Sequence, residues 1–340
     1  MEGDNAIRQS IRDNLSSWSK KLNCNGDTEK KLAYKMKFIK ELKKLQIAIE
    51  TDAANQQHYE VETDFFLTIL GKRLKYSGCY FKTPETTLNQ AEEDTLQLYC
   101  ERARLCDGME VMDLGCGWGA TGLWVCEKYP NCNVTCISNS STQAKYINEQ
   151  AEKRGYLPRL KCITADANTF STEEKFDRVI SIEMFEHMKN YDQLMAQISS
   201  WLKPDGLLFL QVLCHREACY HFKTSRHSDT EWMAKHFFTG GTMPSTDLLL
   251  YFQKDLLIED HWNVNGDHYS RTLEAWMKKL DCNKDKVLSI FRKLHGDDAE
   301  KQIFNWRMFF IYCSETFAFN GGNEWLVCHQ LFKKKPKSNL

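Results

Sequence analysis

The sequence predicts an α/β fold built on a mostly parallel sheet with helices on both faces. Two observations carry this prediction. Between residues 108 and 214, short apolar runs alternate with segments of helical character, as they do in successive strand and helix units of a parallel sheet. A glycine-rich stretch, VMDLGCGWGA at 111–120, lies where the first of these runs meets the first helical segment.

The region 1–107 is predicted to be a helical segment ahead of the sheet. Residues 1–50 set apolar side chains among lysines, which is typical of an amphipathic helix that packs on a core. Residues 59–81 mix short helix with turns, and residues 89–108 form a second helical stretch that ends at a glycine.

The region 108–214 is predicted to be the central core of the fold. Strands are expected at 109–114, 132–138, 159–166, 175–183 and 206–214, and helices at 121–129, 141–155 and 191–202. Because a helix stands between most successive strands, we expect neighbouring strands to run parallel.

The region 215–340 is predicted to be a helical cap with a closing strand. Beyond Cys214 the alternation stops, and segments rich in aromatic residues look like helices and turns. The last apolar segment, EWLVCHQLFKK at 324–334, has strand character and is expected to close the sheet. No Pro/Gly/Ser-rich linker separates the three regions, so we expect one globular unit.

Composition argues against several classes of partner. The 45 Lys and Arg residues nearly balance 46 Asp and Glu residues, so no global field favours nucleic acid. The apolar stretches are too short to span a bilayer, so stable membrane insertion is not expected. Fourteen cysteines without an apolar export segment after Met1 predict a cytoplasmic protein with reduced thiols. The stretch CHREACYHF at 214–222 has zinc-binding residue types but lacks paired C-x2-C spacing, so no metal is predicted.

The glycine loop has two interpretations. Gly115, Gly117 and Gly119 let the backbone approach a ligand closely, and the loop also satisfies the G-x-G-x-x-A pattern of dinucleotide sites. In a dinucleotide site an acidic residue should end the next strand and hold the ribose. Here that strand ends in Ser138 and Asn139, which makes the dinucleotide interpretation less favourable.

Two aspartates favour a different nucleoside ligand. Asp113 precedes the glycines, where it can orient the loop, and Asp166 follows the third strand, where it can accept a hydrogen bond from an adenine amino group. This set resembles the class I S-adenosylmethionine-dependent methyltransferases, whose first motif commonly reads as DLGCGWG does at 113–119.

The resemblance extends over most of the chain, from about Gln57 to Lys335. The segments that carry it include HYEVETDFF, LKYSGCYF, FEHMKNYDQL, FFTGGTMPS, NGDHYSRTLEAW and NEWLVCHQLFKK. Together they look like the cyclopropane-fatty-acid synthase superfamily, and within it like small-molecule N-methyltransferases of the coclaurine N-methyltransferase type. The resemblance implies a Rossmann-like class I methyltransferase sheet with an antiparallel last strand, and S-adenosylmethionine as the cofactor.

The resemblance also implies which residues bind this cofactor. Tyr76 and Ser77 match contacts made from the N-terminal region, which would tie that region to the cofactor and substrate site. The remaining matches follow the core strands: Gly115 and Gly117 in the first loop, Asn139 and Gln143 on the ribose side, Asp166 and Ala167 on the adenine side, and Ile182 beneath the sulfonium. Asp113, which precedes the loop, is predicted to contribute to the same site.

Three titratable residues, Glu183, Glu186 and His187, follow the apolar run FDRVIS. Ligands bind outside the carboxyl ends of parallel strands, so we expect these residues to face the reacting atoms. Glu183 and Glu186 would share one face of a helix. An amine arrives mostly as an ammonium ion, which carboxylates attract and a histidine can deprotonate. The resemblance makes the three a substrate-handling triad, with the carboxylates positioning the amine and His187 as the base.

The lipid branch of the superfamily offers an alternative function. Lipid cyclopropane synthases hold a bicarbonate base with a Cys, a Glu, a His and a Tyr, and the matching positions here are Gly78, Glu186, Gln211 and Tyr269. Two of these four residues differ, which counts against a reaction on unsaturated acyl chains. A protein that binds the cofactor without turnover is a third class.

The expected function is methyl transfer to the nitrogen of a small aromatic or alkaloid-like amine, of the benzylisoquinoline or phenylalkylamine type. Three further residues are predicted to contact this substrate. Glu60 matches a substrate contact in some relatives, Tyr269 is placed for a hydrogen bond at the reaction centre, and Trp325 is one of the late aromatic residues expected to wall an apolar pocket. The small-molecule amine is the expected partner, and the sequence leaves a homodimer open.

Overall fold

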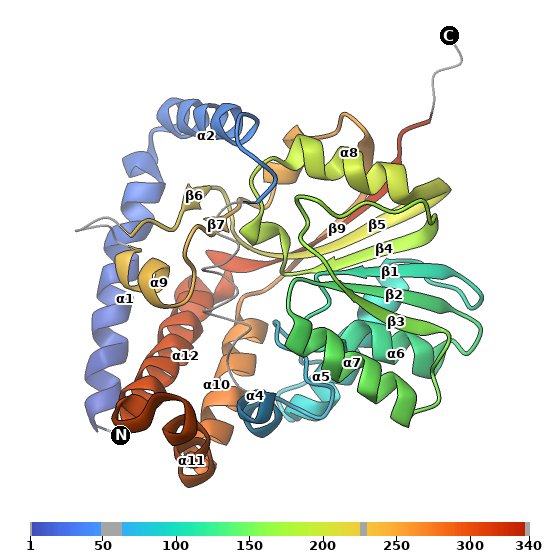
Figure 1. Cartoon of the computed structure of the whole chain (residues 1–340). Coiled ribbons are helices and arrows are strands. Elements are labelled where there is room, and N and C mark those ends of the chain that lie inside the picture. The colour runs from blue at the N-terminus through green and yellow to red at the C-terminus, as the bar shows by residue number, and fades with distance from the viewer. Residues whose placement is uncertain (1, 49–62, 225–229, 337–340) are drawn as a thin grey trace.

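The computed structural model describes residues 2–48, 63–224 and 230–336, and Figure 1 shows one sheet with helices on both sides. The seven strands of the sheet lie in the order β3-β2-β1-β4-β5-β9-β8. They are β1 (Glu110–Leu114), β2 (Asn133–Ser138), β3 (Leu160–Thr164), β4 (Phe176–Ile182), β5 (Leu202–His215), β8 (Leu256–Val264) and β9 (Trp325–Lys334). A small separate pair is formed by β6 (Tyr220–His221) and β7 (Thr242–Met243).

The strand directions confirm the predicted sheet. Strands β1 to β5 pair in parallel, and β9 runs antiparallel to β5 on one side and to β8 on the other. The last strand of the chain is therefore antiparallel, as expected, but it is inserted inside the sheet and does not lie at its edge.

The sequence does not predict β8, which forms the edge beyond β9. Most of its side chains are only partly buried, because an edge strand has a neighbour on one side alone. Its residues Glu259 and Asp260 form ion pairs with Arg104 across the surface. These two charges interrupt the apolar pattern that marks the inner strands, so the segment looks like a loop in the sequence.

Helices cover both faces of the sheet and extend beyond one end of it (Figure 1). They are α1 (Glu2–Leu22), α2 (Thr28–Leu42), α4 (Thr63–Ile69), α5 (Leu88–Arg102), α6 (Ala120–Lys128), α7 (Ser141–Lys153), α8 (Tyr191–Trp201), α9 (Glu231–His236), α10 (Asp267–Cys282), α11 (Lys284–His295) and α12 (Ala299–Gly322). Successive residues of β4 show that both faces are buried: Val179 packs in the core that includes α2 and α8, and Ile180 packs in the core that includes α5, α6 and α7.

The first 48 residues form two helices instead of the single amphipathic segment that the sequence suggests. Cys24 and Asn25 have φ values of 49° and 52°, so the chain leaves the helical conformation between α1 and α2. Asp27 then starts α2, because its side chain accepts a hydrogen bond from the backbone N–H of Lys30 at 3.0 Å.

The helices α1, α4, α10, α11 and α12 pack around a second apolar core at one end of the sheet (Figure 1). Ion pairs fasten α1 to α12: Arg8 and Arg12 both reach Glu315, at 2.7 and 2.5 Å, and Arg307 reaches Asp4 at 2.7 Å. The N-terminal helix thus closes the cap that the late helices build.

Candidate active site

The glycine loop between β1 and α6 forms one wall of a cavity. Gly115 has a φ of 79°, and a Cβ at this position would lie 2.6 Å from Cγ of Met184. Gly117 has a φ of 51°, and a Cβ there would meet no atom within 4 Å, although the residue lines the cavity. The loop therefore presents bare backbone to open space, which is the shape that a closely approaching nucleoside ligand needs.

Asp113 lies buried on β1, just before the loop. Its Oδ2 accepts a hydrogen bond from the backbone N–H of Gly122 in the first turn of α6, at 3.1 Å, and so joins strand and helix across the glycines. Burial raises the pKa of Asp113 to about 7. This position suits a residue that orients the loop, and its part in cofactor binding stays a prediction.

The cavity lies at the carboxyl ends of β1, β2 and β4, where open α/β sheets bind their ligands. All ten residues predicted to bind the cofactor line it: Tyr76, Ser77, Asp113, Gly115, Gly117, Asn139, Gln143, Asp166, Ala167 and Ile182. On the β2 side, the hydroxyl of Ser138 donates to Oε1 of Gln143 at 2.8 Å, which fixes the Gln143 amide. Five separate segments of the chain thus converge on one space.

The segment that carries Tyr76 and Ser77 is held by a buried carboxylate that the sequence analysis did not single out. Glu92 of α5 accepts hydrogen bonds from the backbone N–H groups of Gly71, Arg73 and Lys75, at 3.1, 2.7 and 3.3 Å. Burial raises the pKa of Glu92, against the effect of these donors. One side chain therefore satisfies three backbone groups and sets the path of the segment into the cavity.

Lys75 is a second residue that the sequence analysis missed. Its Nζ is buried at the cavity wall and donates to the Ser77 hydroxyl at 2.7 Å and to the Gly78 carbonyl at 2.5 Å. Burial lowers the pKa of Lys75, whereas the nearby carboxylate of Glu183 raises it. The KYSG motif gives no sign of this role, because lysines are common at surfaces.

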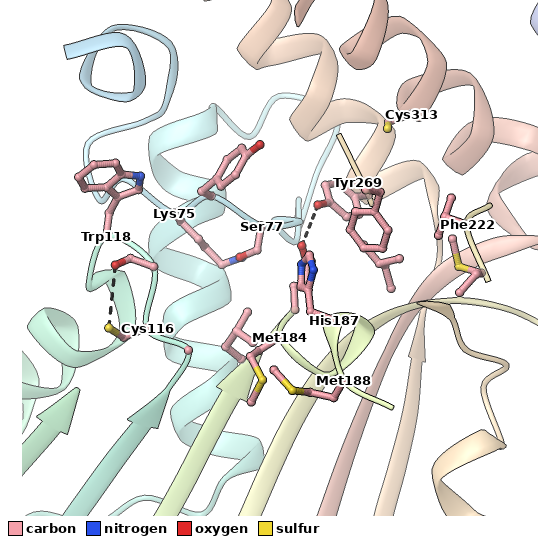
Figure 2. A pocket seen from close by; sticks show the side chains of 18 of the residues that line it. Lys75, Ser77, Cys116, Trp118, Met184, His187, Met188, Phe222, Tyr269 and Cys313 are labelled. Carbon is pink, nitrogen blue, oxygen red and sulfur yellow. Dashed lines mark hydrogen bonds between the residues drawn. The ribbon is translucent and has the colours of Figure 1, made fainter. Parts of the chain in front are cut away.

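Glu183 lies at the end of β4, where its carboxylate accepts three hydrogen bonds. Oε1 accepts from the backbone N–H of Gly78 at 3.0 Å and from Nε2 of Gln211 at 2.7 Å, and Oε2 accepts from the Tyr269 hydroxyl at 2.7 Å. Burial raises the pKa of Glu183, and Lys75 and the three donors oppose that rise. Figure 2 shows Tyr269, Lys75 and Ser77 among the side chains that line the cavity.

Glu186 is the one described site residue that does not line the cavity. The expectation of a shared helical face is wrong, because Glu183 has a φ of 51° and the short 3-10 helix begins only at Phe185. Glu186 turns inward, where its Oε1 accepts from the backbone N–H of Leu213 at 2.6 Å. Burial raises the pKa of Glu186 well above its ordinary value, and the charge of Glu183 raises it further.

His187 lines the cavity beside Glu183, and Figure 2 shows its ring projecting toward the middle of the space. The centre of its ring lies 4.8 Å from that of Phe238, which also lines the cavity. A proton acceptor and a buried carboxylate therefore face the same space from one turn of chain. The catalytic roles of the three triad residues stay predictions.

The positions that match the bicarbonate ligands of the lipid enzymes have acquired a different use. Gly78, Gln211 and Tyr269 all donate hydrogen bonds to the carboxylate of Glu183. Space beside Gly78 is also tight, since a Cβ there would lie 3.0 Å from Cγ of Tyr269 and the ring would have to shift. A carboxylate of the chain itself thus occupies these donors.

The far end of the cavity is apolar and aromatic. Trp325, predicted to contact substrate, lines it, and its Nε1 donates to the hydroxyl of Tyr220 at 3.1 Å. The sequence analysis missed Leu15 and Trp18 of α1, which reach the same wall because α1 packs on the cap. Further members of the wall are Phe222, Met233, Phe238, Met243, Phe309, Tyr312 and Phe317.

Three remaining predictions concern residues or properties outside this wall. Glu60 lies outside the described residues. His215, from the zinc-like stretch, bonds Glu324 at 3.1 Å, and the part of the chain that the structure describes contains no group of three metal-ligating side chains arranged for an ion. No helix within the described ranges is long and apolar enough to cross a membrane.

The chain is similar to known proteins over nearly its whole length. The family model described as "Mycolic acid cyclopropane synthetase" matches residues 47–330. The (S)-coclaurine N-methyltransferase of Thalictrum flavum subsp. glaucum is 40% identical over 340 residues, covering 98% of this chain and 92% of its own. A crystal structure of coclaurine N-methyltransferase bound to N-methylheliamine and SAH superposes with a TM-score of 0.93, covering 97% of this chain and 95% of that one.

Similarity to the lipid branch is more distant. The cyclopropane-fatty-acyl-phospholipid synthase of Escherichia coli (strain K12) is 30% identical over 227 residues, which covers 66% of this chain and 56% of that enzyme. The amine methyltransferase thus matches at higher identity and over nearly the whole chain.

Proposed function

The chain belongs to the mycolic acid cyclopropane synthetase family, and from this premise we propose that it methylates the nitrogen of a small aromatic amine of the alkaloid type. It is an S-adenosylmethionine-dependent N-methyltransferase, as its full-length similarity to coclaurine N-methyltransferase indicates.

The residues of the cavity fit S-adenosylmethionine. The bare backbone at Gly117 leaves space for the methionine portion, whereas the missing side chain at Gly115 makes room for Met184. The Asn139 and Gln143 amides suit ribose hydroxyls. Asp166 supplies an acceptor for an adenine amino group. When bound, the cofactor supplies a methyl group on a sulfonium centre.

We assign the handling of the amine to Glu183 and His187. The buried carboxylate of Glu183 attracts an ammonium ion and keeps its nitrogen near the glycine loop, because the three donors hold the carboxylate in one orientation. His187 takes the proton that the nitrogen must lose before its lone pair can attack. The remaining contribution of the site is alignment, which the rigid strand ends provide.

The observation that carries the proposal is the pairing of one buried carboxylate with an aromatic wall across a single cavity. A protonated aromatic amine matches both parts, with its nitrogen at Glu183 and its rings among Trp325, Phe238 and their neighbours. An acyl chain has no charge for Glu183 to bind. Gly78, Gln211 and Tyr269, which match three of the four bicarbonate-holding positions of the lipid enzymes, donate to Glu183 in this chain.

Mass spectrometry of purified protein incubated with S-adenosylmethionine tests the proposal. One sample receives mixed tetrahydroisoquinolines and phenylalkylamines, and the other receives unsaturated phospholipids. We expect products heavier by one methyl group among the amines and none among the lipids. Cyclopropanated lipid would transfer the assignment to the lipid branch, and cofactor binding without any product would identify a non-catalytic binding protein.

We also propose that the regions 1–107, 108–214 and 215–340 act as one unit around this site, and that the enzyme works in the cytoplasm. Leu15 from the first region and Trp325 from the third both line the cavity, which supports the first point. Cell fractionation checks the second. Light scattering decides whether a homodimer forms.

A further inference from the structure

Behind Glu183 a chain of buried polar side chains runs away from the cavity. Gln211 on β5 donates from Nε2 to Glu183 Oε1 at 2.7 Å. Its own Oε1 lies 2.8 Å from Nε2 of His329 on β9, and Nδ1 of His329 lies 2.6 Å from Nη1 of Arg102 at the end of α5. Gln211 and His329 are almost fully buried, so neither side chain can turn to water for a partner.

The proton positions along this chain follow from its far end. An arginine guanidinium carries donors only, so Nδ1 of His329 must accept from Arg102. The remaining hydrogen of the neutral imidazole therefore lies on Nε2, which donates to Oε1 of Gln211. Burial lowers the pKa of His329 well below its ordinary value, and the charge of Arg102 adds to this, so the ring stays neutral.

A second donor fixes the same atom. The hydroxyl of Tyr99 on α5 donates to Oε1 of Gln211 at 2.6 Å. With two donors on its oxygen, the Gln211 amide has one favourable orientation, in which its NH₂ group faces Glu183. A flipped amide would set its oxygen against a carboxylate and its NH₂ against two donors, which leaves buried groups unpaired.

Arg102 packs against the edge strand of the sheet. Its guanidinium lies over the ring of Trp262 on β8, with Cζ 4.9 Å from the ring centre. Two neutral side chains, His329 and Gln211, therefore link the always-protonated Arg102 near the surface to the Glu183 carboxylate in the cavity. None of its inner members, Gln211 or His329, lines the cavity.

We propose that Arg102, His329 and Gln211 form a positioning relay that sets the orientation of the Gln211 amide and thereby keeps the Glu183 carboxylate ionised and aimed at the substrate nitrogen. The proposal rests on the proposed function, because it assigns a purpose to the Glu183 charge. Its three residues come from α5, β5 and β9, which are distant in sequence and meet only in the folded protein.

Other charged or titratable groups also act on Glu183, and the relay adds to them. The titratable groups around it are Lys75 and Cys79 in the segment after α4, Tyr269 on α10, Tyr99 on α5 and Glu186 in the short helix after β4. Of these, only Tyr99 also touches Gln211. A change at His329 therefore tests the relay while every residue that bonds Glu183 directly keeps its side chain.

The test uses the full-length enzyme with His329→Leu, and Gln330→Leu as the matched control. Gln330 is the next residue of β9, equally buried, and its side chain bonds the Thr246 carbonyl on the other face of the sheet. Isotope-edited infrared spectroscopy, with a Glu183→Gln sample subtracted, follows ionisation of the Glu183 carboxyl against pH. We expect the midpoint to move to higher pH in His329→Leu and to stay unchanged in Gln330→Leu. An unmoved midpoint in His329→Leu overturns the proposal.

Kinetics give a second readout with a clear expectation. His329→Leu should lower kcat for the amine about tenfold, because the Gln211 amide is no longer held by His329 and its charge-assisted hydrogen bond to Glu183 is lost. The KM for S-adenosylmethionine should stay nearly unchanged. His329→Gln, which can keep a donor near Nε2, should restore most of that rate. In a Glu183→Gln background, His329→Leu should cost nothing more, and a full additional tenfold loss would show that it acts elsewhere.

The outcomes remain separable from those of the proposed function. If the wild type methylates no amine while the infrared midpoint still shifts, the relay stands and the substrate assignment fails. If His329→Leu does not fold, Arg102→Leu at the half-buried end of the chain takes its place. In Arg102→Leu the tautomer of His329 is no longer fixed, so the ionisation midpoint of Glu183 should again move to higher pH. In Arg102→Lys that midpoint should stay unchanged.

Discussion

Replacing Glu183 by glutamine removes one negative charge from the cavity and leaves its shape nearly intact. The carbonyl oxygen of the new amide can still accept from Gly78 and Gln211, the two donors that Oε1 accepts in the wild type. The NH₂ group then faces the Tyr269 hydroxyl, which can turn and accept. The substitution therefore isolates the effect of charge on the bound amine.

The size of this effect follows from Coulomb's law. Two opposite unit charges about 4 Å apart attract by about 4 kcal/mol at an effective dielectric constant of about 20. That energy corresponds to a factor of about 10³ in kcat/KM for the amine. We expect initial rates of methyl transfer to a tetrahydroisoquinoline to fall by about this factor in Glu183→Gln, with the KM for S-adenosylmethionine changed far less.

Stability should respond in the opposite direction. Burial raises the pKa of Glu183, so the folded state loses stability as pH rises through that pKa and the carboxyl ionises. Glutamine has no such loss, so chemical denaturation should show Glu183→Gln gaining stability over the wild type as pH rises. Glu186→Gln, a control of the same residue type outside the cavity wall, should lose less activity. A Glu183→Gln enzyme that keeps a tenth of the wild-type kcat/KM would refute the reasoning.

Three further predictions use other parts of the site. Gly78→Ala places a Cβ 3.0 Å from the Tyr269 ring, so it should push that ring away from Glu183 and lower kcat about tenfold. An unchanged kcat in steady-state assays would contradict this expectation. Glu92→Ala leaves three backbone N–H groups without their partner, so the free energy of unfolding measured in urea should fall by about 3 kcal/mol or more. Calorimetry should also show weaker binding of the cofactor. A fall in the free energy of unfolding of less than about 1 kcal/mol would argue against this role of Glu92. Burial lowers the pKa of Lys189 to about 7, so the unfolded state takes up a proton before the folded state does and stability falls as pH falls from about 10 to 7. The free energy of unfolding of Lys189→Met should therefore exceed that of the wild type by at most about 5 kcal/mol below pH 7. An equal difference at pH 6 and at pH 10 would exclude this cause.

The core strands and the cofactor wall could be predicted from the sequence because their signals are local. Each strand of β1 to β5 is a short apolar run next to a helix, and the glycines of the first loop stand in fixed positions after Asp113. The carboxyl ends of parallel strands then come together whatever the details of packing. For that reason every predicted cofactor residue lines one cavity.

The parts that escaped prediction depend on contacts between distant segments. The left-handed conformation of Glu183 is held by donors from Gly78, Gln211 and Tyr269, so the three-residue spacing to Glu186 misleads. Trp18 reaches the cavity only because α1 is ion-paired to α12, some three hundred residues later in the chain. No local sequence pattern predicts these contacts between distant segments.

The position of β9 inside the sheet has a consequence for how the protein is made. Residues 325–334 are synthesised after every other strand that the structure describes, yet they pair with β5 on one side and β8 on the other. Until they leave the ribosome, the edge of β5 has no partner and β8 has no sheet to join. The glycine loop and Glu183 are then already present in the nascent chain, but the partner of Gln211 on β9 is not. A working site can therefore assemble only after β9 has been synthesised.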